Sequence, residues 1–81
     1  MDINQYIAID PNICHGTPIF RDEQGRPMRV MVYLALDLLG AGETPEQIAA
    51  SYPGLTIQAI QAAQHYAADL LRTHQYLPSS S

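Results

Sequence analysis

The chain has 81 residues, with four Arg, no Lys and eight Asp or Glu, so its formal net charge is −4. An acidic chain is poorly suited to hold nucleic acid unaided, because Lys and Arg must replace the counterions of the phosphates. A single cysteine excludes an intramolecular disulfide framework, and the apolar stretch 30–42 is shorter than the roughly 20 residues of a membrane span. We therefore expect a cytoplasmic, soluble, single domain over residues 1–81 with no membrane contact.

Residues 6–29 predict a small β-ribbon with turns. Residues 6–9 and 19–21 are rich in the β-branched and aromatic side chains of strands. The polar run 22–25 ends in glycine and is typical of a hairpin loop, so residues 26–29 are expected to form the returning strand. A ribbon of this size is marginal by itself and needs a helical layer to pack on.

Three helices are predicted in residues 30–74, and residues 75–81 are expected to form a frayed tail. The first helix covers 30–39 and stops at the glycines that follow, because glycine readily adopts the left-handed conformation of a helix C-cap. The third covers 56–74, with Thr56 as its N-cap. Its apolar side chains recur at three- and four-residue spacing, which predicts one buried stripe: Ile57, Ile60, Ala63, Ala67 and Leu71 or Leu70.

The second helix has the clearest start. Thr44 is a good N-cap, Pro45 fits the first helical position, and Gln47 follows Thr44 by three residues as in a capping box. The helix should end near Tyr52, because the proline and glycine that follow cannot continue it. Three helices with a short turn between the last two give a helix-turn-helix outline. The predicted fold is therefore mainly α, a small N-terminal β-ribbon followed by a three-helix helix-turn-helix domain.

The first helix is apolar on all sides apart from Asp37. Three short helices cannot enclose one of their own number, so part of this helix should meet the ribbon and part should meet a second chain. The alternative is that the ribbon covers the excess by itself. Asp37 is either paired with an arginine or faces solvent. We predict a homodimer or partner interface at four residues: Met31, Leu34, Ala35 and Leu38.

No catalytic residue, metal site or cofactor is predicted. Adjacent Cys14 and His15 would point to opposite sides of an extended segment. A structural zinc site needs about four Cys or His ligands at local spacings, a pattern that the sequence does not contain. Cys14 is then a small buried hydrophobe. We therefore expect that the protein is not an enzyme.

Two groups of residues are candidates for DNA contact. The third helix presents an outward polar face, where glutamine can pair bidentately with adenine: Gln58, Gln61, Gln64 and Arg72. The ribbon carries three arginines, and a β-ribbon can enter the major groove: Arg21, Arg26 and Arg29. Phosphate contacts supply much of the affinity, and acidic residues outnumber arginine in residues 43–74, so nucleic acid is the weaker expectation for a partner.

Several short segments occur in an order that resembles a known family: Ile13-Cys14-His15-Gly16-Thr17-Pro18-Ile19, Gly40-Ala41-Gly42, Thr44-Pro45-Glu46-Gln47-Ile48, Tyr52-Pro53-Gly54-Leu55-Thr56 and Ile60-Gln61-Ala62-Ala63-Gln64-His65-Tyr66-Ala67. Over residues 7–71 the chain resembles the domain of unknown function 433 family, bacterial and archaeal proteins with an antitoxin-like helix-turn-helix fold. The resemblance implies a non-enzymatic partner protein, the antitoxin of a type II toxin–antitoxin pair that binds and neutralises a PIN-like nuclease. Related antitoxins bind operator DNA, so the alternative is a DNA-binding transcriptional regulator.

The sequence departs from this family in the ribbon. Family members continue with Gly-Thr-Arg-Ile-Pro-Val, whereas residues 21–30 hold an additional acidic loop before Gly25. Gly25 and Val30 match the family pattern, but the family's arginine and proline fall on Pro27 and Arg29. No role of that arginine is carried over to this chain. The longer acidic hairpin favours a different choice of partner.

Overall fold

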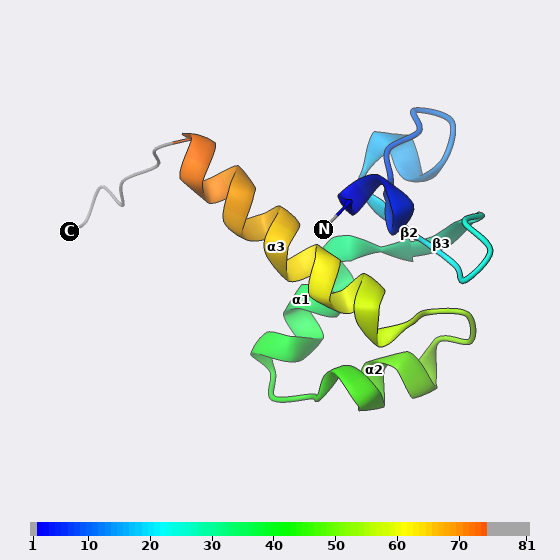
Figure 1. Cartoon of the computed structure of the whole chain (residues 1–81), viewed down its shortest axis with the longest axis vertical. Helices are drawn as coiled ribbons and strands as arrows, with labels where there is room; N and C mark the ends of the chain where they lie inside the picture. The colour runs from blue at the N-terminus through cyan, green and yellow to red at the C-terminus, as the bar shows by residue number, and fades with distance from the viewer. Residues whose placement is uncertain (1, 75–81) are drawn as a thin grey trace.

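The structure, a computed structural model, describes residues 2–74 and places a small sheet before three helices (Figure 1). Two 3₁₀ turns, η1 (Ile3–Gln5) and η2 (Cys14–Gly16), accompany the strands β1 (Ile7–Ala8), β2 (Ile19–Arg21) and β3 (Pro27–Met31). The helices are α1 (Val32–Gly40), α2 (Pro45–Ser51) and α3 (Ile57–His74). This arrangement confirms the predicted order of a ribbon followed by three helices. The predicted tail 75–81 lies outside the described residues.

The three strands form one antiparallel sheet in the order β1-β2-β3. Strands β2 and β3 pair at Ile19–Met31 and at Arg21–Pro27, so two steps along β2 match four steps along β3. β3 therefore bulges between these two pairs. A bulge on an edge strand disturbs the ladder and discourages pairing with a strand of another chain.

The start of the first helix differs from the prediction. Met31 pairs with Ile19 and has extended backbone angles (φ −77°, ψ 141°), so the returning strand runs on to Met31. The N–H of Val32 donates to the carbonyl oxygen of Pro18 at 2.9 Å, which continues the ladder to the first residue of α1. Apolar residues such as these suit a buried strand and a buried helix equally, so their hydrophobicity does not locate the boundary.

Asp22 organises the loop between β2 and β3. Its Oδ1 accepts hydrogen bonds from the backbone N–H groups of Gln24 (2.9 Å) and Arg26 (3.0 Å). The N–H of Asp22 donates in turn to the carbonyl oxygen of Arg26 at 2.8 Å. The hairpin loop predicted over residues 22–25 is therefore a tight turn, and its first acidic residue has a structural role.

Replacing Asp22 with alanine is expected to lower the free energy of unfolding by about 1–2 kcal/mol, because two backbone N–H groups lose their acceptor. Urea unfolding followed by far-UV circular dichroism measures this loss. The neighbouring Glu23→Ala is the matched control, since Glu23 is exposed and its removal should change stability by less than about 0.5 kcal/mol. Equal losses in the two variants would show that the Oδ1 bonds do not stabilise the loop.

Both predicted N-caps are confirmed. Thr44 Oγ1 accepts from the backbone N–H of Gln47 (3.1 Å), and Gln47 Oε1 accepts from the N–H of Thr44 (2.8 Å), which completes the capping box. Thr56 Oγ1 accepts from the N–H of Ala59 at 3.1 Å. Each bond satisfies an N–H that has no partner inside its helix. The caps thus fix where α2 and α3 begin.

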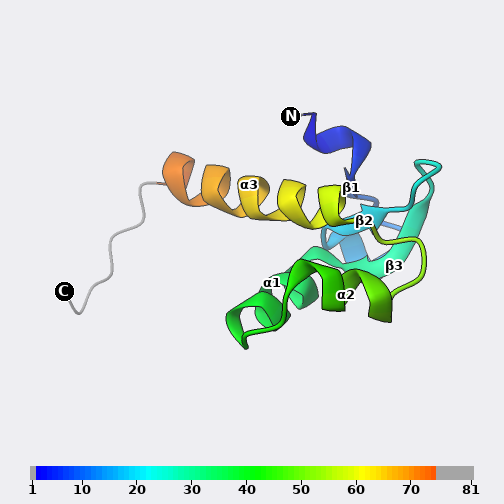
Figure 2. The ribbon, with the colours of Figure 1, turned by 60° about the horizontal axis from the view of Figure 1, so that its bottom comes forward.

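The core lies between the sheet and the three helices. Figure 2 shows α3 on one side and α1 with α2 on the other, with the sheet beside the first turns of α3. α1 buries Val32 and Ala35. The largest fully buried side chains come from β2, α2 and α3: Phe20, Ile19, Ile48 and Ile60. The first half of α3 therefore packs against the sheet and against both other helices.

Only the first half of α3 follows the predicted stripe. Ile60 and Ala63 are buried and Ala67 is half-buried, but Leu70 is 41% exposed and Leu71 is 67% exposed. The second half of the helix extends away from the sheet and from α2 (Figures 1 and 2). The prediction that Leu71 or Leu70 completes the core is therefore wrong. Helical spacing tells which side chains share a face, not how far the neighbouring layers reach along it.

Candidate protein-interaction surface

An apolar groove, the α1–α3 groove, lies where these two helices meet. Its volume is about 160 Å³ and its exposed surface is apolar throughout. Ligand pockets usually measure about 300–1,000 Å³, so the groove fits the side chains of a partner better than a free small molecule. Both helices line it, together with the segment before β2: Val32, Tyr33 and Leu36 from α1, Tyr66, Ala67 and Leu70 from α3, and Thr17 and Pro18.

Large exposed apolar side chains stand on both walls of the α1–α3 groove. Tyr33 on α1 is 52% exposed, and Leu70 on α3 is 41% exposed. A single exposed apolar residue is ordinary, but apolar side chains that gather around one depression favour contact with another molecule. The groove is therefore the strongest candidate for a contact with a second polypeptide.

The charge beside the groove is negative. Asp37 is exposed on α1, one turn after Tyr33 on the same helix face. Of the two alternatives for Asp37, the structure shows the solvent-facing one. The ion pair found in residues 2–74 joins Asp69 and Arg72 on α3 and does not include Asp37. The carboxylate of Asp37 thus remains available to a cation on a partner.

The four residues predicted for an interface differ in how deeply they are buried. Ala35 is 1% exposed in the core of its own chain, so its inclusion is corrected: it has no surface to offer a partner. Leu38 is half-buried and packs against the core cluster. Met31 and Leu34 are also half-buried. Leu34 and Leu38 are four residues apart and so share one flank of α1, opposite the flank of Tyr33 and Leu36 that lines the groove. An interface at this opposite flank stays a prediction.

The sequence pattern did not point to the α1–α3 groove. The pattern includes Tyr33 in a helix that is apolar all round and predicts Leu71 or Leu70 as part of the core. One signal was available in the helix lengths, since α3 has 18 residues whereas α1 has 9 and α2 has 7. Helices of those lengths cannot cover α3 from end to end.

No helix in residues 2–74 combines the length and hydropathy needed to cross a membrane.

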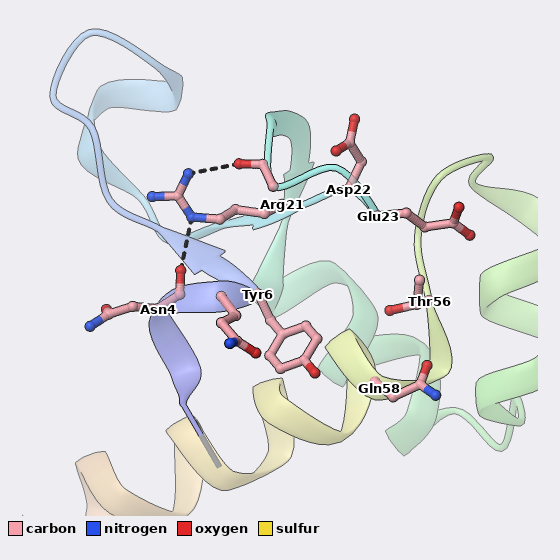
Figure 3. A pocket seen from close by; sticks show the side chains of 9 residues that line it. Asn4, Tyr6, Arg21, Asp22, Glu23, Thr56 and Gln58 are labelled. Carbon is pink, nitrogen blue, oxygen red and sulfur yellow. Dashed lines mark hydrogen bonds between the residues drawn. The ribbon is translucent and has the colours of Figure 1, made fainter.

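Arg21 ties the N-terminal segment to the hairpin. Its Nε donates to the carbonyl oxygen of Asn4 and its Nη1 donates to that of Gly25, each at 3.0 Å (Figure 3). The side chain is half-buried. A guanidinium held by two carbonyl groups is less free to contact a phosphate, so the predicted ribbon patch loses one of its three arginines.

The other arginines predicted for DNA contact differ in how free they are. Arg72 pairs with Asp69 through Nη1 and Oδ1, so its charge is partly neutralised. Arg26 and Arg29 are exposed; Arg26 precedes β3 and Arg29 lies in it, and β3 is an edge strand. Of the four arginines, these two keep the freest side chains.

The predicted glutamine face of α3 is exposed. Gln58, Gln61 and Gln64 all face solvent. A shallow hollow of about 600 Å³ follows this face, lined by Gln61, Gln64, His65 and Ala68. The polar side chains that could touch base edges are therefore accessible, as the sequence predicts.

Acidic side chains lie near the beginning of α3. Asp22 and Glu23 line an open hollow of about 710 Å³ together with Thr56 and Gln58 (Figure 3). A Cβ added to Gly54 would lie 3.4 Å from the Cβ of Asp22, so the hairpin rests against the turn between α2 and α3. Carboxylates here oppose the approach of a phosphate to the N-terminus of the helix. The departure from the family pattern thus weakens α3 as a DNA-reading helix.

The Cys14–His15 pair lies in a left-handed turn. The φ angles of Cys14, His15 and Gly16 are 51°, 57° and 81°, so the expectation of an extended segment is wrong. Cys14 is half-buried rather than buried, and His15 is exposed. Among residues 2–74 no three or more His, Cys, Asp or Glu side chains gather in a way that could hold a metal ion.

Comparisons with known proteins point to one family. The model of the family described as "Protein of unknown function (DUF433)" matches residues 7–67. The crystal structure of a DUF433 member from Anabaena variabilis ATCC 29413 is similar, with a TM-score of 0.69 and 28% sequence identity over 83% of this chain. This chain spans 61% of the length of that protein. A comparison of this chain with curated proteins found no match. Because the family model covers most of the sequence, the chain belongs to the DUF433 family.

Proposed function

We propose that this chain is a non-enzymatic protein-interaction module, the antitoxin-like half of a pair, which binds and neutralises a PIN-like nuclease in the cytoplasm. The single observation that carries the proposal is the α1–α3 groove, whose exposed apolar walls have no covering in residues 2–74. Burial of such surface is the main favourable term in protein association. The identity of the partner class follows from the resemblance of the sequence to antitoxin-like proteins.

Charge supports a basic partner. The chain carries a formal net charge of −4, and opposite net charges steer two proteins into contact and raise the association rate. A nuclease that holds nucleic acid needs a positive surface of its own. An acidic module that docks beside that surface also repels the substrate, which gives a physical route to neutralisation.

The proposal includes a homodimer through the opposite flank of α1. Met31, Leu34 and Leu38 keep part of their apolar surface exposed there. Tyr33 lies on the groove side of the helix, so one chain can hold a second copy and a nuclease at the same time. Light scattering of the purified chain measures whether it forms a homodimer, independently of whether it binds a nuclease.

Co-expression with the product of the adjacent reading frame tests the proposal. We expect the two proteins to co-purify as a complex of defined mass, and the nuclease activity of the partner to fall as this chain is titrated in. Purification of this chain alone, with no effect on the activity of a neighbouring nuclease, would reject the antitoxin role.

A helix-turn-helix transcriptional regulator is the second candidate, and the accessible glutamine face of α3 favours it. The α2–turn–α3 order and the two exposed arginines, Arg26 and Arg29, are its other support. A mobility-shift titration against its own promoter at low and high salt is the test. Each phosphate contact that is lost should reduce the log–log salt slope by about 0.9, so the Arg26→Ala and Arg29→Ala variants should show shallower slopes. Binding that is absent, or that salt leaves unchanged, rejects the regulator.

A further inference from the structure

We propose that the α1–α3 groove receives the apolar side chains of an amphipathic helix of the partner, and that a Lys or Arg of this helix pairs with Asp37. The inference rests on the proposed function, because it names the chemistry by which the same groove recognises its partner. Three observations carry it: the apolar surface of the groove, the helices that form its two walls, and the exposed carboxylate beside it.

The shape of the groove favours a helix as its occupant. Two helices, α1 and α3, pack against each other and leave Tyr33 and Leu70 on opposite walls. Side-chain ridges of a third helix fit the depression between two packed helices, as helices generally pack ridge into groove. An amphipathic helix supplies such a ridge at positions three and four residues apart, and its polar face stays in water.

The charges around the groove favour a basic occupant. Asp37 is exposed one turn of α1 after Tyr33, which lines the groove, and has no ion-pair partner in residues 2–74. On α3, Asp69 and Arg72 pair with each other and are not among the residues that line the groove. The exposed carboxylate of Asp37 is therefore the charge that a cation on the partner helix complements.

The same charges disfavour a second copy of this chain in the groove. A two-fold interface places the same patch of both copies in contact. Each copy would bring its exposed Asp37, one turn from the groove residue Tyr33, so the two chains would place like carboxylates in the same interface. Like charges brought together across an interface weaken it, whereas a basic helix removes the imbalance.

Model peptides test the chemistry directly. The probe is a fluorescently labelled amphipathic peptide of Leu, Ala and Lys, about 15 residues long so that it can hold a helix. Its counterpart carries Glu in place of every Lys. Fluorescence anisotropy titration of the full chain is expected to show binding of the Lys peptide and at least tenfold weaker binding of the Glu peptide. Equal binding of both peptides would overturn the role of charge.

Variants of the full chain locate the binding. Ala67 lines the groove, whereas Ala68 faces the other side of α3, so Ala67→Leu fills the groove and Ala68→Leu is the matched control. Ala67→Leu should weaken binding of the Lys peptide about tenfold or more, as expected when a central pocket is blocked, and Ala68→Leu should leave it unchanged. Asp37→Asn should weaken it about two- to fivefold, the range of an exposed ion pair. Circular dichroism confirms that each variant keeps its helices.

Three results would overturn the inference. The first is equal binding by the Ala67→Leu and Ala68→Leu variants. The second is a wild-type dimer that dissociates on Ala67→Leu, which would assign the groove to a second copy. The third is a neighbouring nuclease that binds the wild type and the Ala67→Leu variant equally, which leaves the proposed function standing at another surface. If the wild-type chain binds the Lys peptide more tightly than the Glu peptide but does not bind the nuclease, the proposed recognition of a basic helix by the groove is supported and only the antitoxin role is rejected.

Discussion

Replacing Phe20 with alanine is expected to unfold most of the protein at ambient temperature or to lower its melting temperature by about 15 °C or more. Phe20 is fully buried and is among the largest side chains of the core. Phenylalanine-to-alanine changes in cores cost about 3–5 kcal/mol, because the lost apolar transfer energy adds to the cost of the cavity. A domain of this size is stabilised by roughly 0.05–0.15 kcal/mol per residue, so one such change removes much of the total.

Two further variants make this result interpretable. Phe20→Leu keeps most of the volume and should cost clearly less than the alanine variant. Ile9→Ala removes an aliphatic side chain next to β1 that is 59% exposed, and should change stability by less than about 0.5 kcal/mol. Thermal unfolding followed by circular dichroism measures all three. A Phe20→Ala variant as stable as Ile9→Ala would contradict the position of Phe20 in the core.

Local chemistry made parts of this fold predictable from the sequence. Thr44 with Gln47, and Thr56, are cap residues whose hydrogen bonds reach only three residues along the chain. Glycine at position 25 and the polar residues before it likewise indicate a hairpin without reference to any other element. Such signals depend on neighbours in sequence, so a single sequence contains all the information that they require.

The boundary between β3 and α1 could not be predicted in the same way. Val30 and Met31 are apolar residues that either a strand or a helix would bury. What decides between them is the pairing of Met31 with Ile19, a contact between residues twelve apart that depends on how the sheet forms. The competition is settled by tertiary contacts, which outweigh the weak local preference.

The candidate site was predicted only in its general character. The apolar excess of the first helix indicated a surface for another polypeptide, but Ala35 turned out to be core and Tyr33 to be exposed. Which flank of α1 is covered depends on where α3 crosses it and where β3 joins it. Neither is encoded in the spacing of apolar residues within one helix. The groove therefore becomes visible only when the helices are placed together.

Replacing Leu70 with alanine is expected to weaken binding of the nuclease partner by about thirtyfold, whereas Leu71→Ala changes it by less than about threefold. Leu70 lines the α1–α3 groove and is 41% exposed, so a docked helix would remove the rest of its surface from water. Leu71 is 67% exposed and is not part of the groove lining. Hot-spot residues of interfaces cost about 2 kcal/mol or more when truncated, and contacts at the rim cost far less.

The two adjacent leucines form a matched pair because they share a helix, a residue type and a high exposure. Leucine and alanine both favour helices, so neither variant should disturb α3, and equal melting temperatures would confirm this. Isothermal titration calorimetry with the purified nuclease then compares affinities. If Leu71→Ala weakens the complex as much as Leu70→Ala, the contact follows the tip of α3 rather than the groove. The contrast between these neighbours therefore decides whether the surface between α1 and α3 is where the partner binds.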